Sequence, residues 1–147
     1  MKDLLLAIKS HLQGDGNLNY VQAMSIFITP DEGLIPNQVK LPAISIKDGS
    51  IKNEQELCNN YLQSALVKVT VYQRIFKPEE SIVGTHGVLE MAADVIASLI
   101  GNKLGLTGIE NVFPIGEGES QIMGRENEMM QMKGISFLYL RHRTWQP

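Results

Sequence analysis

The chain has 147 residues, of which 44% are hydrophobic and 20% charged, so it is expected to fold as one globular domain, residues 1–147, and not as a disordered chain. The formal net charge of -3 removes a broad electrostatic attraction for nucleic acid, and the single cysteine, Cys58, excludes an internal disulfide and suits a reducing compartment. No segment approaches the roughly 18 apolar residues of a membrane span, and the N-terminus lacks a signal-peptide cleavage site, so a soluble, cytoplasmic protein is expected.

The first elements are a helix and a strand. Residues 2–12 predict a short amphipathic helix, because apolar side chains recur at helical spacing: Leu4, Leu5, Ile8 and Leu12. The sequence SIFIT within residues 21–29 predicts a strand, and the turn-forming residues 30–33 end it.

Two further strands are predicted before the middle of the chain. The sequence LPAISI (41–46) alternates, and Asp48-Gly49 predicts a hairpin turn directly after it. Residues 53–60, NEQELCNN, fit either a loop or a helical turn. Residues 63–76 alternate over their whole length and predict a long strand whose second face is only partly covered.

Residues 84–102 have the clearest helical periodicity in the chain. One side is apolar and is expected to pack on a sheet. The other side carries polar and small residues: His86, Glu90, Ala93, Asp94, Ala97, Ser98 and Gly101. Because solvated faces usually carry long charged side chains, this small-residue face is a candidate packing surface for a neighbouring subunit.

The C-terminal third predicts two strands around a polar segment. Residues 109–115 read as a strand, 116–120 (GEGES) as a loop, and 121–128 as a polar, turn-rich segment. Residues 129–144 alternate as a strand, in which Gly134 predicts a bulge or bend. Strands grouped on either side of one helix predict an α+β fold. Its sheet is expected to be mostly antiparallel and packed against one long central helix, with a short N-terminal helix.

In size, order of elements and general sequence character the chain resembles the tail-terminator and tail-completion proteins of long-tailed phages. The likeness is to small tail proteins of Mu-like and lambda-like prophages in particular. The segments that carry the likeness are LPAISI, VKVTVYQRIF, the central helix and MKGISFLYLRHR. The resemblance implies a protomer that joins a ring, typically a hexamer, at the head-proximal end of the tail tube, with other tail and head-connector proteins as partners. The expected location is the virion tail, and the host cytoplasm during assembly. The family implies no catalytic residue and no cofactor.

A metal- or ligand-binding domain, or an enzyme, is the alternative. His86, Glu90 and Asp94 are four residues apart on one helix, so all three lie on the same face. No second cluster of His or Cys completes a ligand set, and a polar helix face is the simpler interpretation.

Two charged segments are further candidates. The glutamates of residues 116–128 could bind a cation or a basic partner, or form a solvated loop: Glu117, Glu119, Glu126 and Glu128. The basic cluster Arg141-His142-Arg143 fits a solvated strand end, a phosphate contact, or a salt bridge to the acidic loop of a neighbouring subunit.

The sequence therefore predicts a structural, non-enzymatic phage tail protein with no metal and no sequence-specific nucleic-acid binding. Eight residues are the expected subunit contacts: Glu90, Ala93, Asp94, Ala97, Glu117, Glu119, Arg141 and Arg143.

Overall fold

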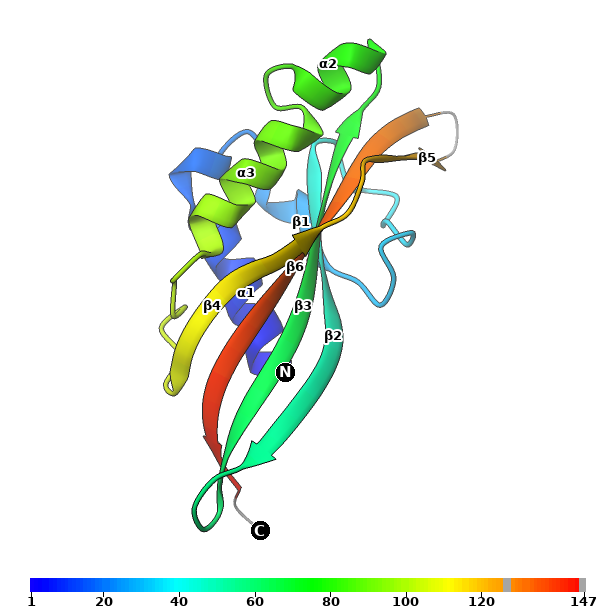
Figure 1. Cartoon of the computed structure of the whole chain (residues 1–147). Helices are drawn as coiled ribbons and strands as arrows, with labels where there is room; N and C mark the ends of the chain where they lie inside the picture. The colour runs from blue at the N-terminus through cyan, green and yellow to red at the C-terminus, as the bar shows by residue number, and fades with distance from the viewer. Residues whose placement is uncertain (126–127, 146–147) are drawn as a thin grey trace.

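The computed structural model describes residues 1–125 and 128–145, which form an α+β fold around a six-stranded mixed sheet (Figure 1). The strands are β1 (Ile26–Ile28), β2 (Ala43–Gln55), β3 (Asn60–Arg74), β4 (Ile109–Glu117), β5 (Gln121–Arg125) and β6 (Glu128–Thr144). Their order is β1-β2-β3-β6-β4, with β5 paired to β6 beyond that path. The β1–β2 pair is parallel and the other pairs are antiparallel. The sheet is therefore mixed, and its strand pairs are mostly antiparallel, as predicted.

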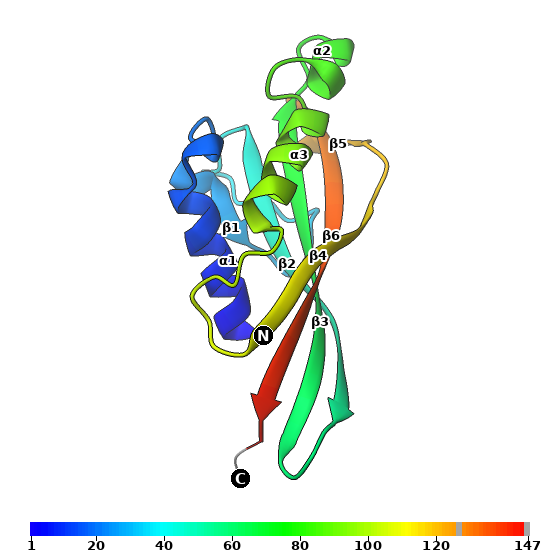
Figure 2. The same ribbon diagram turned by 60° about the vertical axis from the view of Figure 1, so that its left-hand side comes forward.

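Two helices cover one face of the sheet, and the N-terminal helix, expected to be the shorter one, is as long as the central helix. They are α1 (Lys2–Gly14) and α3 (Val88–Leu99), and both lie on the same side of the strands in Figure 2. Leu4, Ile8 and Leu12 of α1 are buried with Met91 and Val95 of α3 in the main core. The burial of this apolar face stabilises the two-layer arrangement.

The helix predicted over 84–102 is present but shorter, because it begins at Val88 and ends at Leu99. A short helix, α2 (Pro78–Val83), ends at Gly84, and α3 begins at Val88. The two glycines between them have no room for a side chain: a Cβ on Gly84 would lie 2.6 Å from the Glu80 carbonyl oxygen, and a Cβ on Gly87 would lie 2.8 Å from the Ile82 carbonyl oxygen. Close backbone approach therefore fixes the break.

By length and composition, Pro78–Leu99 could cross a membrane, with a mean hydropathy of 1.3 over an 18-residue window. This corrects the expectation that no such segment exists. The break before α3 and the buried residues Met91, Val95 and Leu99 give the segment a different explanation, because its apolar face packs on the sheet. We therefore interpret the high hydropathy of residues 78–99 as that of a helix packed in the protein core.

The turn predicted at Asp48-Gly49 is wrong. Both residues lie inside β2, where the pairing with β3 shifts between Asp48 and Ile51 as at a bulge. The chain turns instead at residues 56–59, within the segment 53–60 that fits a loop or a helical turn in sequence. The Glu56 amide donates to the Asn60 carbonyl over 2.9 Å and closes the hairpin. The strands consequently extend into a long arm that projects past the helices (Figures 1 and 2).

Two predictions for the C-terminal strands are also corrected. Gly134 causes no bulge in the β3–β6 pairing, which runs without a shift from Asn60 to Arg74. Residues 121–125 form β5, where a turn-rich segment was expected.

A second, smaller hydrophobic core lies on the face of the sheet away from the helices. Its buried members come from residues 27–43, β3 and β6: Phe27, Val39, Ala43, Tyr72 and Met130.

Candidate interaction site

The outer face of α3 carries the predicted contact residues Glu90, Ala93, Asp94 and Ala97. Glu90, Ala93 and Ala97 are exposed, whereas Asp94 is half-buried. The Tyr20 hydroxyl donates a hydrogen bond to Asp94 Oδ2 over 2.8 Å. The chain after α1 therefore covers one side of this face and leaves Ala93 and Ala97 open.

Tyr20 also packs against His86. Their rings stack with centroids 3.7 Å apart and an interplanar angle of 17°. Burial, followed by the neighbouring Asp94 carboxylate, raises the pKa of Tyr20 well above its usual range, so its hydroxyl stays a donor. These contacts tie α3 to the segment between α1 and β1.

The alternative site predicted on this helix consists of His86, Glu90 and Asp94, and these residues have separate contacts. His86 Nδ1 lies 3.5 Å from Glu90 Oε1, while Asp94 is held by Tyr20. Within residues 1–125 and 128–145, no group of three or more His, Cys, Asp or Glu side chains is placed to hold a metal ion. The structure does not bring the three residues together as a ligand set.

The acidic loop follows β4. Glu117 Oε1 lies 3.9 Å from Lys133 Nζ, which also donates to the Gly118 carbonyl over 2.7 Å. Glu119 is exposed and has no hydrogen-bond or ion-pair partner among the described residues. Glu128 pairs with Arg74 across β3 and β6, and Glu126 lies outside the described residues. Glu119 is thus the free carboxylate of the described part of this loop.

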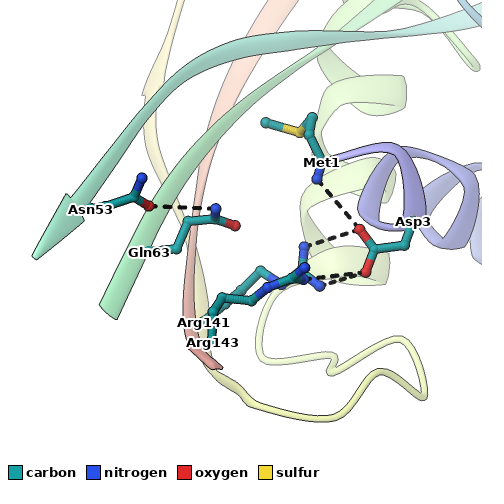
Figure 3. A network of polar contacts seen from close by, with 6 residues as sticks. All are labelled: Met1, Asp3, Asn53, Gln63, Arg141 and Arg143. Atoms are coloured by element: carbon teal, nitrogen blue, oxygen red, sulfur yellow. Dashed lines mark hydrogen bonds and ion pairs between the residues drawn. The ribbon is translucent and has the colours of Figure 1, made fainter. Parts of the chain in front are cut away.

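Arg141 is the residue that the structure places most differently from expectation. Its side chain is 2% exposed, so a solvated strand end is wrong for this residue. Figure 3 shows its guanidinium against Asp3 at the start of α1, with Nη2 2.6 Å from Oδ2 and Nη1 3.3 Å from Oδ1. Hydrogen bonding from Arg141 holds the pKa of Asp3 well below its usual range.

Asp3 was not among the predicted site residues. In sequence, Asp3 is an acidic residue in the first turn of a helix, which is a common position for one. Only the fold brings it to Arg141, 138 residues later in the chain. It also receives Arg143 Nη1 at 3.5 Å and the N-terminal amine at 3.4 Å (Figure 3). The half-exposed carboxylate of Asp3 therefore contacts two guanidinium groups and the N-terminal amine.

A hollow of about 310 Å³ adjoins this network. Its lining includes the side chains or backbone of Asp3, Thr107, Gly108, Arg141, Arg143 and Thr144. Two buried atoms on the neighbouring strands β6 and β3, Arg141 Nε and Gln63 Oε1, have no hydrogen-bond partner among the described residues. Gln63 is the cross-strand neighbour of Arg141. We call this hollow the arginine pocket.

His142 lies between these arginines in sequence but faces the other side of the sheet. Its Nδ1 lies 3.3 Å from Glu56 Oε2 in the hairpin turn, and its Nε2 2.8 Å from Glu110 Oε2 on β4. The hydrogen bond with Glu56, with the charges of both glutamates, raises the pKa of His142. His142 thus joins the tip of the arm to the edge strand.

The arm and its surroundings expose several large apolar side chains. Leu57, at the hairpin turn, is 84% exposed, and Trp145, just after β6, is 59% exposed. Leu89 on α3 and Ile100, directly after α3, are 43% and 52% exposed. Apolar side chains at such positions are typical of surfaces that pack against other chains, although single ones also occur on monomers.

Comparison with known proteins identifies the fold. No family model matches the sequence, and neither does any curated protein. Among solved structures, the chain is similar to a chain in the virion of a native gene transfer agent particle. The TM-score is 0.69, the sequence identity 13%, and the alignment covers 95% of each chain. The fold defines an α+β protein of the same architecture as that virion chain.

Proposed function

We propose that this protein is a structural, non-enzymatic component of a phage-like particle that forms a ring as a tail terminator or tail-completion factor. The observation that carries the proposal is the end-to-end similarity of fold to a chain of the gene transfer agent virion. It agrees with the resemblance of the sequence to phage tail proteins. The protein would act in the virion tail and assemble in the host cytoplasm.

The mechanism would be geometric. Identical protomers joined head-to-tail through heterologous contacts close into a ring when the rotation between neighbours is a whole fraction of a turn. A closed ring offers one surface to the last tube subunit and a different surface to the head connector. The exposed part of α3 around Glu90, Ala93 and Ala97, the loop with Glu117 and Glu119, and Arg143 are the proposed contact elements.

Sedimentation velocity and negative-stain electron microscopy of the purified chain test this function. We expect closed rings at micromolar concentration, and we expect Ala93→Arg to reduce them, because a long charged side chain cannot enter a close helix contact. Ser10→Arg, on the exposed outside of α1, is the matched control and should leave the rings intact.

A second experiment addresses the role in the tail. Added to polymerising tube protein from the same particle, the ring should limit tube length and be seen at one end. A chain that stays monomeric at every concentration, both alone and with tube protein, would contradict the proposed function.

A further inference from the structure

We infer that the arginine pocket binds a carboxylate, and that its occupant is Glu119 of a neighbouring copy of this chain. The inference rests on the proposed function, since it names one contact through which the ring would close. It is argued from the charge balance of the pocket, its unsatisfied polar atoms, and the position of the free carboxylate.

The charge balance of the pocket is incomplete. Arg141 and Arg143 project from the same side of β6, because they are two residues apart on a strand. Both contact the single carboxylate of Asp3, at 2.6 Å and 3.5 Å. Two guanidinium groups against one carboxylate leave an excess positive charge, and a second carboxylate would remove the repulsion between them.

The pocket also has unused hydrogen-bonding capacity. A guanidinium has five N–H donors. Each of the two terminal nitrogens of Arg141 donates to Asp3, while its buried Nε has no acceptor among the described residues. Thr107 also lines the hollow, whereas the hydroxyl of Thr144 already donates to Asn60 Oδ1 over 2.9 Å. Buried polar groups of this kind are normally satisfied, so a polar ligand suits the site.

The positions of the pocket and of Glu119 point to contact between copies. Thr107 and Gly108 precede β4, whereas Glu119 follows it. The nine residues of β4 hold the two ends about 26 Å apart at roughly 3.3 Å per residue. Glu119 of one protomer therefore cannot enter its own pocket, but it can enter that of a neighbour in a head-to-tail assembly.

Charge reversal tests the contact. Arg143→Glu alone and Glu119→Arg alone should each weaken assembly about tenfold or more, since each places like charges together. An equimolar mixture of the two variants should assemble again, because every pocket then meets a loop of opposite charge in an alternating ring. Arg74→Gln, which removes a cation on the same sheet outside the pocket, is the control and should assemble like the wild type.

A peptide titration tests the site without requiring assembly. The probe is an acetylated, amidated peptide of sequence GEGESQ, corresponding to residues 116–121, observed through the amide resonances of Gly108 and Arg143. It should shift these resonances in the wild type. The shifts should be lost with a peptide in which Glu119 is replaced by glutamine, and in the Arg143→Gln protein, which keeps the side-chain length near Asp3.

The outcomes separate this inference from the proposed function. If wild-type rings form and neither reversal affects them, the inference is overturned and the ring function stands. If the wild type never assembles, autonomous ring formation fails, and absence of peptide binding would then overturn the pocket as well.

Discussion

Gly134 on β6 leaves the space that the side chain of Lys68 on β3 occupies. A Cβ built at Gly134 would lie 2.6 Å from Lys68 Cε, closer than two carbon atoms can pack. In this position Lys68 Nζ reaches Glu32 Oε1 at 2.7 Å, in the loop after β1. The glycine that suggested a bulge in sequence instead admits a side chain that ties this loop to the sheet.

Gly134→Ala is expected to displace Lys68 and lower the free energy of unfolding by about 0.5–1 kcal/mol, a small effect because the ion pair is partly exposed. Gly116→Ala on β4, where an added Cβ meets no atom within 4 Å, should be neutral. Chemical denaturation measures both. In a Lys68→Ala background the cost of Gly134→Ala should vanish, and an unchanged cost would exclude Lys68 as its cause.

Asp3→Asn should lower the free energy of unfolding at pH 7 by about 1–3 kcal/mol. Removing the carboxylate leaves Arg141 buried without its counter-charge, but Asp3 is half-exposed, so solvent reduces the cost. Glu54→Gln, at an exposed carboxylate 3.6 Å from Lys52, is the control and should change little.

The Asp3 contribution should also depend on pH in a defined direction. Because its pKa is lowered in the folded protein, its stabilisation is present above the unfolded value near 3.8 and is lost as the pH falls towards the folded value. Denaturation of the wild type and Asp3→Asn between pH 2 and pH 7 should show their difference shrinking below pH 4. A constant difference would refute an ionic origin.

Gly108→Ala should destabilise more than Gly105→Ala. Both glycines have positive φ, 84° and 71°, so each substitution carries the backbone strain of about 1 kcal/mol. At Gly108 the added Cβ would also lie 2.5 Å from the His142 carbonyl oxygen, whereas at Gly105 it meets nothing within 4 Å. Thermal unfolding should therefore rank the wild type, Gly105→Ala and Gly108→Ala in order of falling stability, with about 2–4 kcal/mol lost at Gly108. Equal losses at the two positions would show that the close contact is relieved.

The hairpin turn should loosen as the pH rises. The folded pKa of His142 is raised, so its stabilising contact with Glu56 is fully present below the unfolded value near 6.5 and is lost as the pH rises through the folded value. Hydrogen exchange, corrected for the intrinsic rate, should show less protection of the Asn60 amide at pH 8.5 than at pH 6. His142→Gln should remove this pH dependence, and His11→Gln should retain it.

The sequence by itself determined the elements with long, regular periodicity. The N-terminal helix, the β3 and β6 strands and the α3 helix each repeat a buried side chain often enough to identify the element and its buried face. Short and irregular elements were missed or misplaced. Asp48-Gly49 carries turn chemistry but lies in a bulge, because β2 remains paired with β3 on both sides of it.

Only the tertiary structure decided the environment of the candidate site residues. Arg141 and Arg143 are the same residue type on the same face of β6, yet Arg141 is buried against Asp3 while Arg143 stays partly exposed. Asp94 resembles Glu90 in sequence, yet Tyr20 binds it and leaves Glu90 open. Each difference depends on a partner distant in the chain, and periodicity along one element carries no information about such a partner.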